Sequence, residues 1–244
     1  MLTLALLIAA GGASNAWALL DARPIRGSNR VLSEANYAEL KLVASDAAAG
    51  DDFGYSVAID GNTVVIGATG AGTGGAVYVL RTTDGGATYV EVAKLTASDG
   101  AAYDGFGRSV SIDGDTIVVG AYADNIDGGD GGSYDNGQGS AYVYRTSDGG
   151  ATYVEVAKLT AADAAQNDQF GESVAIDGAT VVVGAYGKDS STGAVYVYRT
   201  TDGWGTYTEI KLTAADAAAG DWFGIFVAID GDTVVVGASS AGTT

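Results

Sequence analysis

Carboxylates are the side chains of this sequence with the widest capacity for chemistry. The 244 residues contain 30 Asp and Glu but no Cys and no His. Disulfides, the usual zinc sites, thiol nucleophiles and histidine acid–base catalysis are therefore excluded. What remains is oxygen chemistry, namely cation binding or the paired-carboxylate hydrolysis of glycosidic bonds.

The densest acidic segment covers residues 124–136. Asp124, Asp127, Asp130 and Asp135 alternate there with glycines, and carboxylate oxygens on a pliable backbone suit Ca²⁺. The spacing matches no EF-hand loop, so a solvated acidic loop is the alternative. We predict these four aspartates as candidate calcium ligands and calcium as the candidate cofactor.

A carboxylate hydrolase needs two acidic groups that are unique to one place in the fold. Most glutamates instead recur in register with the repeat described next, and recurrence is typical of a structural device. Those without a clear counterpart are Glu34, Glu39 and Glu172. We predict no enzyme, and two of these carboxylates about 5–10 Å apart in a cleft would favour glycan hydrolysis.

The net charge is −18, from 12 Lys and Arg against 30 Asp and Glu. Such a charge repels phosphate backbones and anionic lipid headgroups. We therefore expect no nucleic-acid partner. The 47% hydrophobic residues and 38 glycines, with a single proline, indicate a folded chain of short strands and tight turns.

Internal repetition governs the organisation of the chain. The pair Phe-Gly occurs four times, at intervals of 53, 64 and 53 residues, and a Gly-Ala pair follows fourteen residues after each Phe. The four pairs begin at Phe53, Phe106, Phe170 and Phe223. The longer interval contains the acidic segment, so this segment is an insertion specific to the second unit.

Four strands are predicted in each unit. In the first unit, residues 56–59 alternate small or polar with β-branched residues, and an Asp-Gly turn signal joins them to the β-branched run 63–66; residues 76–80 and 89–92 supply two more strands. Four antiparallel strands in about 53 residues is the size of a propeller blade. The fold class is thus all-β.

The run from Phe53-Gly54 to Gly67-Ala68, followed by Gly75-Ala76, resembles the FG-GAP repeat of integrin-α-type β-propellers over nearly all of residues 40–238. The resemblance implies a β-propeller of four-stranded blades and an extracellular role in adhesion or protein recognition, with no reaction. Integrin-type repeats carry a calcium loop between the first two strands. Here that place holds only short Asp-Gly turns, so those metal sites are not carried over.

A second resemblance lies between the third and fourth strands. Residues 82–89 and 146–153 are similar to the Asp-box of sialidase-type propellers, and residues 200–207 depart from it by placing Trp204 at a glycine position. The Asp-box implies a structural hairpin. Sialidase chemistry would need converging arginines, whereas Arg81, Arg145 and Arg199 occupy equivalent places in successive units.

Aspartates also recur in register, seven and two residues before each Phe and seven residues after it. We predict that they cap turns by accepting hydrogen bonds from their own backbone, rather than forming a repeated cation site. Trp204 and Trp222 have no tryptophan counterpart in the other units, and we predict them as candidate exposed contacts.

The ends of the array indicate an incomplete or truncated propeller with three full units and a half unit. The repeat array covers residues 37–244, with units at about 43–93, 96–157, 160–210 and 213–244. Residues 37–42 match the fourth-strand segment 207–212, although no blade precedes them. Unpaired edges of such an open arc predict self-association.

The N-terminus is predicted to direct export. Residues 1–18 combine an apolar run with Ala16-Trp17-Ala18, which is typical of a signal peptide, and residues 19–36 form a linker. Arginines after the apolar run favour the alternative of an uncleaved anchor. We predict a secreted or cell-surface protein with no other membrane insertion.

Together these patterns predict a protein-interaction or adhesion module without catalytic activity, with a protein or glycan ligand. Two alternatives stay open: a glycan-binding or glycan-hydrolysing propeller that uses carboxylates, and a structural surface-coat protein.

Overall fold

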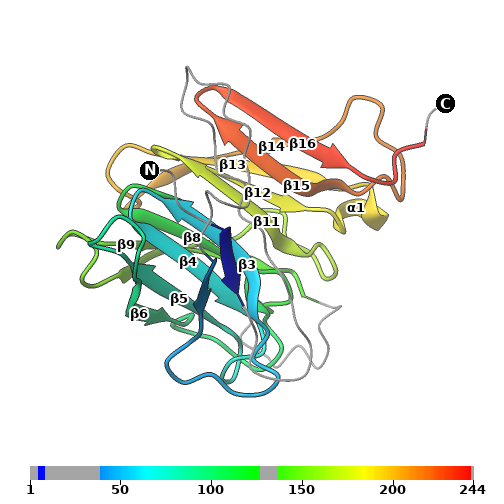
Figure 1. Ribbon diagram of the computed structural model, residues 1–244. Coiled ribbons are helices and arrows are strands. Elements are labelled where there is room, and N and C mark those ends of the chain that lie inside the picture. Colours follow the sequence, from blue (N-terminus) through cyan, green and yellow to red (C-terminus); the bar gives the residue numbers. More distant parts are fainter. Residues whose placement is uncertain (1–4, 9–38, 127–136, 243–244) are drawn as a thin grey trace, which may run out of the picture.

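The computed structural model describes residues 5–8, 39–126 and 137–242 (Figure 1). Within these ranges the chain is all-β apart from one helical turn, α1 (Lys188–Ser191). The described residues contain no helix long and apolar enough to span a lipid bilayer.

Three units each form a four-stranded antiparallel sheet whose strands follow one another in space as in sequence. The first sheet contains β3 (Phe53–Asp60), β4 (Thr63–Ala68), β5 (Ala76–Arg81) and β6 (Val90–Leu95). The second contains β7 (Phe106–Asp113), β8 (Thr116–Ala121), β9 (Ser140–Arg145) and β10 (Val154–Leu159). The third contains β11 (Phe170–Asp177), β12 (Thr180–Ala185), β13 (Ala194–Thr200) and β14 (Tyr207–Leu212).

The fourth unit has two described strands, β15 (Phe223–Asp230) and β16 (Thr233–Ala238), which form an antiparallel pair. The prediction of three full units and a half unit is therefore confirmed. Each Gly-Ala pair lies at the end of a second strand, at Ala68, Ala121, Ala185 and Ala238.

Burial explains the strand sequences. All six residues of β4, β8 and β12 are buried, because β8 and β12 lie between neighbouring units and β4 lies between the second unit and the segment that contains Leu42 and Ala44. Their sequences are accordingly continuous β-branched runs, whereas the outer strand β10 alternates between exposed and half-buried positions.

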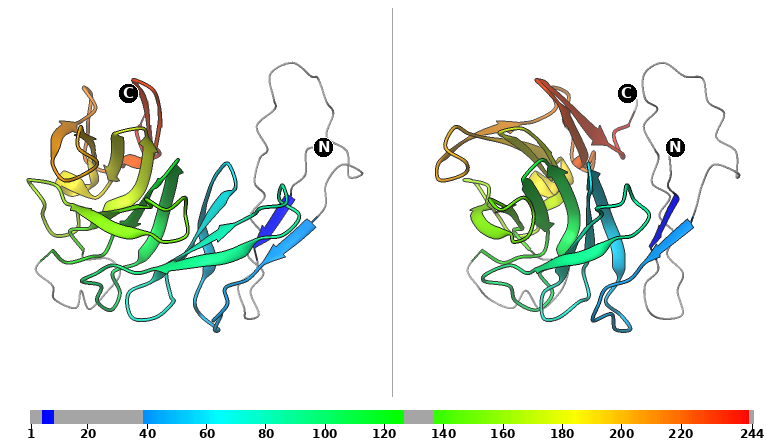
Figure 2. Two further views of the ribbon diagram at one scale, coloured as in Figure 1. Left: turned by 90° about the vertical axis from the view of Figure 1, so that its left-hand side faces the viewer. Right: turned by 60° about the vertical axis from the view of Figure 1, so that its left-hand side comes forward.

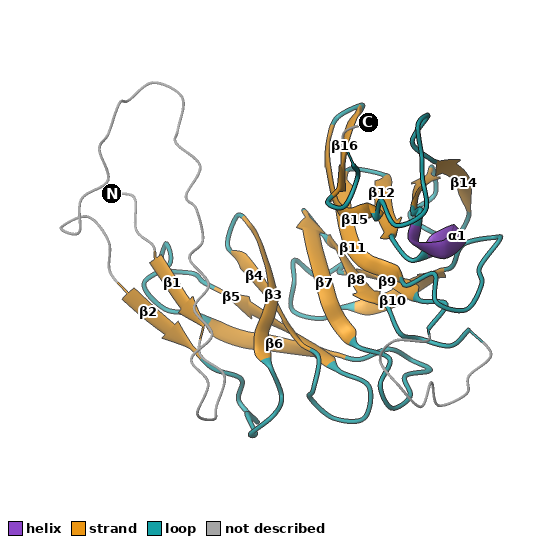
Figure 3. Ribbon diagram, turned by 90° about the vertical axis from the view of Figure 1, so that its right-hand side faces the viewer, coloured by secondary structure: helices purple, strands orange, loops and turns teal. Residues whose placement is uncertain are grey.

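The sheets stand side by side in an open arrangement that does not close into a ring (Figures 2 and 3). The first strands of successive units are in contact, β3 with β7, β7 with β11 and β11 with β15. Single parallel bridges join Gly75 to Phe106, Gly139 to Phe170 and Gly193 to Phe223. Each of these bridges joins the Phe of a Phe-Gly pair to the preceding unit.

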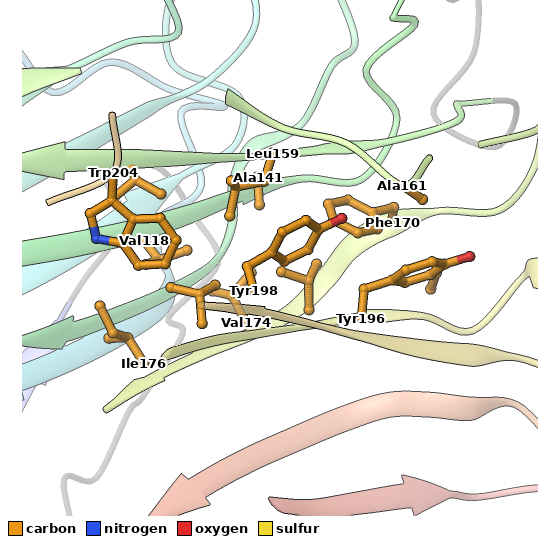
Figure 4. Packing of buried hydrophobic residues seen from close by; sticks show 14 of the residues in the cluster. Val118, Ala141, Leu159, Ala161, Phe170, Val174, Ile176, Tyr196, Tyr198 and Trp204 are labelled. Atoms are coloured by element: carbon orange, nitrogen blue, oxygen red, sulfur yellow. The ribbon is translucent and has the colours of Figure 1, made fainter. Parts of the chain in front are cut away.

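The Phe-Gly and Gly-Ala pairs form the interface between units. Ser56 Oγ donates a 2.7 Å hydrogen bond to the Gly107 carbonyl of the next unit, and a Cβ on Gly67 would overlap that carbonyl. Phe106 packs edge-on against Tyr142, with ring centroids 5.5 Å apart. Figure 4 shows the equivalent core of the third unit, where Phe170 lies beside Tyr196 and Tyr198.

The N-terminal segment that resembles a fourth strand lies outside the four-stranded sheets. β2 (Glu39–Leu42) pairs in parallel with β1 (Ala5–Ile8) in a separate two-stranded sheet. Leu42 and Ala44 are buried against the first unit, together with Phe53 and Ile66. The fourth-strand-like sequence therefore covers the first blade and contributes no strand to the fourth.

Candidate functional site: an arginine–aromatic row across the units

The Asp-box hairpins are self-contained turn structures. Thr82 Oγ1 donates to Asp84 Oδ1 at 2.7 Å, and Asp84 accepts the Thr88 backbone N–H at 2.9 Å and the Thr88 hydroxyl at 2.7 Å. These hydrogen bonds, led by that from the Thr88 side chain, lower the pKa of Asp84 to about 2. The same bonds recur around Asp148 and Asp202. Asp84 is therefore a turn cap.

Trp204 is not an exposed contact, contrary to the prediction. Its side chain is buried in the core of the third unit, near Val118 and Ile176 (Figure 4). It occupies the box position of Gly86 and Gly150 and keeps their left-handed backbone, with φ of 81°. A bulky residue tolerates such a φ only when packing compensates the strain, and here the buried indole supplies that packing.

The aspartates in register divide into three structural roles. Asp51 Oδ2 caps its own loop by accepting the Ala48 N–H at 2.7 Å, as predicted. Asp60, by contrast, accepts the Gly114 N–H of the next unit at 2.7 Å, which corrects the prediction of an own-backbone cap. Asp46 binds the Tyr78 hydroxyl at 2.7 Å and Lys94 Nζ at 2.6 Å. The equivalent bonds recur in the second and third units.

The predicted calcium ligands are only partly within the described residues. Asp127, Asp130 and Asp135 lie outside them. Asp124 is buried, with Lys158 Nζ 2.7 Å from its Oδ2 and the Ser140 hydroxyl bound to the same oxygen. The described residues contain no cluster of three or more Asp or Glu side chains that could hold a metal ion. The loop site stays a prediction.

The three unmatched glutamates do not meet in the described part of the chain. Glu34 lies outside it, and Glu39 is an exposed residue of β2. Glu172 lies on β11, where Arg108 of β7 binds it with two parallel hydrogen bonds: Nε to Oε2 at 2.9 Å and Nη2 to Oε1 at 2.8 Å. Arg81, Arg145 and Arg199 stay apart from this pair on equivalent third strands.

A repeated turn places Arg108 and Glu172 at the start of their strands. The Tyr55 N–H binds the Asp52 carbonyl at 3.0 Å, and the same bond joins Arg108 to Gly105, Glu172 to Gln169 and Ile225 to Trp222. The residue at this position differs in every unit, although the turn that presents it does not. Because the first strands of neighbouring units are in contact, these unit-specific side chains meet.

Arg108 is the centre of a row of side chains drawn from all four units. Its guanidinium carbon lies 4.8 Å from the ring centroids of both Tyr55 and Tyr122. Burial lowers the pKa of Arg108, but the hydrogen bonds to Glu172 and the Coulombic attraction of its carboxylate together outweigh burial and raise the pKa. Tyr186 lies near Arg108, and its ring centroid is 5.8 Å from that of Trp222. We define the Arg108 row as Tyr55, Arg108, Tyr122, Glu172, Tyr186 and Trp222.

Two residues of the Arg108 row are large, exposed aromatics: Tyr55 and Trp222 expose 46% and 41% of their surface. Tyr103, in the loop before β7, exposes 47%. Trp222 and Tyr103 also have left-handed backbones, with φ of 61° and 73°. Bulky residues in this region cost about 1–3 kcal/mol each, and such strain concentrates at binding sites.

The sequence pattern pointed to Glu172 and Trp222 separately but not to Arg108. A signal was present: the residue two places after each Phe is Tyr, Arg, Glu and Ile in turn, while its neighbours recur. Elsewhere, a shallow open groove of about 410 Å³ lies between the turns of the third and fourth units, lined by Asp177, Arg199 and Asp232 among others. Its Arg199–Asp232 pair is exposed, so it is a weaker candidate.

The geometry defines a class of protein: an open β-repeat array with propeller-type blades and a row of side chains from several units around Arg108. The chain belongs to the FG-GAP repeat family, whose repeat matches residues 38–80, 89–144, 153–198 and 207–243. FG-GAP repeats suggest a propeller of the protein-interaction or adhesion type.

The search among curated proteins finds no match. Two of the solved structures that are similar to this chain are the following. Sqt1 of Saccharomyces cerevisiae has a TM-score of 0.44 and 10% identity over 70% of this chain and 38% of that chain. A DUF4623 family protein from Bacteroides eggerthii DSM 20697 has a TM-score of 0.49 and 11% identity over 79% of this chain and 42% of that chain. The chain thus spans less than half the length of either structure.

Proposed function

We propose that this protein is a non-catalytic interaction module, secreted or displayed at the cell surface, that binds a protein ligand through the Arg108 row. The observation that carries the proposal is that Arg108 contacts Tyr55 and Glu172, which stand at the same position of neighbouring units and differ from unit to unit. Regular positions maintain the fold, whereas unit-specific positions on a repeat scaffold are where binding is placed.

The composition of the Arg108 row supports a protein ligand. Tyr, Trp and Arg dominate the energetics of protein interfaces, because they supply a large contact area with a polar handle. Arg108 is held between two rings and a carboxylate, so little side-chain entropy remains to be lost when a ligand binds. The exposed rings of Tyr55 and Trp222 lie at the two ends of the row.

A glycan ligand is the second candidate, favoured by the exposed rings of Tyr55 and Trp222 beside the polar Arg108–Glu172 pair. Hydrolysis of such a ligand is disfavoured by the chemistry of the row. Both oxygens of Glu172 are occupied by hydrogen bonds from Arg108, and no second unmatched carboxylate of the described residues lies beside it.

The test compares ligand capture by three forms of the full chain. Immobilised wild-type protein is incubated with a panel of purified extracellular proteins and with a glycan array. The row variant carries Tyr55→Ser and Trp222→Gly, which remove exposed rings and leave the Arg108–Glu172 pair in place. The control variant carries Val90→Ser and Val154→Ser, which remove exposed side chains of the outer strands β6 and β10.

We expect the wild type and the control to bind a common protein, and the row variant to lose at least about tenfold in affinity. Binding by the row variant at wild-type affinity would contradict the proposal. Binding only to glycans, again lost in the row variant, would establish the second candidate.

Export and self-association remain predictions. Secreted protein that begins at Leu19 would support signal cleavage, and membrane-bound protein that retains Met1 would support the anchor. Sedimentation velocity over a concentration series tests whether the chain associates.

A further inference from the structure

The loop before the first strand carries a buried carboxylate in the second and third units. Asp104 Oδ2 accepts the Ala101 N–H at 2.6 Å, and Asp168 Oδ2 accepts the Ala165 N–H at 2.7 Å. Both aspartates are almost completely buried. The second and third units therefore share an electrostatic requirement, because a carboxylate removed from water needs a compensating positive charge or a proton.

In the third unit, the ammonium group of Lys188 compensates the buried carboxylate of Asp168. Lys188 Nζ lies 2.8 Å from Asp168 Oδ2 and also binds the Asp163 main-chain carbonyl. The Lys188 residue is only 4% exposed, so this is a buried, directed ion pair. Lys188 stands four residues after Gly184, the glycine of the third Gly-Ala pair.

The second unit has the opposite charge at the equivalent position. Asp124 stands four residues after Gly120 and is buried like Lys188. Asp104 therefore lacks the ammonium that Asp168 has, and its Oδ1 is buried without a hydrogen-bond partner. Burial raises the pKa of Asp104 to about 6, and repulsion from Asp124 acts in the same direction.

The summed charge at four equivalent positions differs between the second and the third repeat unit by two elementary charges. In the third unit, two aspartates face two lysines and the total is zero; these residues are Asp163, Asp168, Lys188 and Lys211. In the second unit, three aspartates face Lys158 alone and the total is −2; these residues are Asp99, Asp104, Asp124 and Lys158. Lys158 is already shared, at 2.7 Å from both Asp99 Oδ2 and Asp124 Oδ2.

We propose that the second unit binds one divalent cation, with Ca²⁺ as the expected ion, between Asp104 and Asp124, in the place that the Lys188 ammonium takes in the third unit. The +2 charge of such a cation neutralises the summed charge of −2 at these four positions of the second unit. The buried Oδ1 of Asp104 supplies an anionic oxygen that has no other partner. Ca²⁺ accepts carboxylate, hydroxyl and water oxygens in flexible geometry, which suits a site built from two carboxylates beside Ser140.

This site differs from the calcium loop predicted from the sequence. That prediction shares Asp124 but relies on Asp127, Asp130 and Asp135, whereas Asp104 lies outside the acidic segment. The proposed site also differs from a calcium loop between the first two strands, since Asp104 precedes the first strand and Asp124 follows the second.

The experiment measures Ca²⁺ binding to the full chain, stripped of metal, by isothermal titration calorimetry at pH 7.5. Thermal denaturation in CaCl₂ and in MgCl₂ at equal ionic strength provides a second readout. We expect one Ca²⁺ site per chain and a Tm that rises more in CaCl₂ than in MgCl₂, because Mg²⁺ demands stricter octahedral geometry. No Ca²⁺ binding at millimolar concentration, or equal effects of the two ions, would overturn the proposal.

Variants separate this site from the alternatives. Asp104→Asn should weaken Ca²⁺ binding by about tenfold or more. Asp124→Lys reproduces the third unit, so it should abolish Ca²⁺ binding and raise the Tm in the absence of Ca²⁺. The matched control is Asp51→Asn in the first unit, which should bind Ca²⁺ like the wild type.

A triple variant of Asp127, Asp130 and Asp135 to Asn should also keep the site. Loss of binding in the triple variant, combined with wild-type binding by Asp104→Asn, would assign the ion to the acidic loop and overturn the proposal. Circular dichroism establishes that each variant is folded. Should Asp124→Lys fail to fold, Asp124→Asn replaces it and should weaken binding about as much as Asp104→Asn.

Discussion

Arg108 and Glu172 form a two-point ion pair across the boundary between the second and third units, although they are 64 residues apart in the sequence. Their side chains are only 28% and 10% exposed. Each of these residues stands two places after the Phe of its unit, so the pair is a direct contact between the first strands of neighbouring blades. The Arg108 row depends on this pair, because it fixes the guanidinium between Tyr55 and Tyr122.

Glu172→Gln should lower the free energy of unfolding by about 2 kcal/mol, because it leaves the half-buried guanidinium of Arg108 without a counter-ion. Urea denaturation followed by circular dichroism measures the change. Asp232→Asn is the control, since its partner Arg199 is exposed and such pairs contribute about 0–1 kcal/mol. Equal losses of unfolding free energy in the two variants would show that the buried Arg108–Glu172 pair contributes no more to stability than an exposed pair.

Gly120→Ala and Gly237→Ala should have opposite effects although the two glycines occupy equivalent positions. A Cβ on Gly120 would overlap the Gly171 carbonyl of the next unit, whereas a Cβ on Gly237 meets nothing closer than 3.5 Å. We expect Gly120→Ala to cost about 3 kcal/mol of unfolding free energy. Gly237→Ala should be neutral or stabilising by up to about 1 kcal/mol, through the unfolded state. Denaturant midpoints measured side by side decide the comparison.

Trp204→Gly should destabilise the third unit by about 2 kcal/mol. Removing the buried indole costs about 3–5 kcal/mol, and relief of the left-handed backbone returns about 1–3 kcal/mol. Acrylamide quenching provides a structural readout, because Trp204 should be shielded and Trp222 accessible. A Trp204→Gly protein with wild-type stability would mean that the ring contributes nothing to the core.

Stability should fall as the pH drops from about 4 to 2, in part through the Asp-box aspartates. Hydrogen bonds from Thr88 depress the pKa of Asp84 below the 3.8 of an unperturbed Asp, so its contribution is present above pH 4 and is lost as the pH falls through about 2. Replacement of Asp84, Asp148 and Asp202 by Asn should therefore reduce stability at pH 6 more than at pH 2. Denaturation curves at the two pH values test this, and a difference independent of pH would refute the assignment of the shift to these carboxylates.

Much of the fold could be predicted because each unit is specified locally. The fourteen-residue interval from Phe53 to Gly67 contains a hairpin whose second strand, β4, is buried on both faces, and the constant interval fixes its register. Strand bounds were less accurate at the first strand, where β3 begins at Phe53 and not at residue 56, and at the fourth strand, where β6 runs on to Leu95. That outer strand is half exposed, so hydrophobic patterning constrains its ends less.

Contacts between units could not be read from the repeat pattern. Asp60 was expected to cap its own turn, and it instead binds the turn of the next unit, because adjacent first hairpins lie side by side. Trp204 was expected at the surface, and it is buried because the gap it fills is formed by strands of two different units.

The all-β class, the four-unit repeat, the hairpins and the Asp-box turns follow from the amino-acid sequence alone, because they depend on interactions among residues close together along the chain. Only the tertiary structure decided that Arg108 meets Glu172 and that Asp104 lacks the ammonium which Lys188 gives to Asp168. Such relations join residues about 20 to 64 positions apart, and they arise only when stacked sheets bring the same position of successive units into contact.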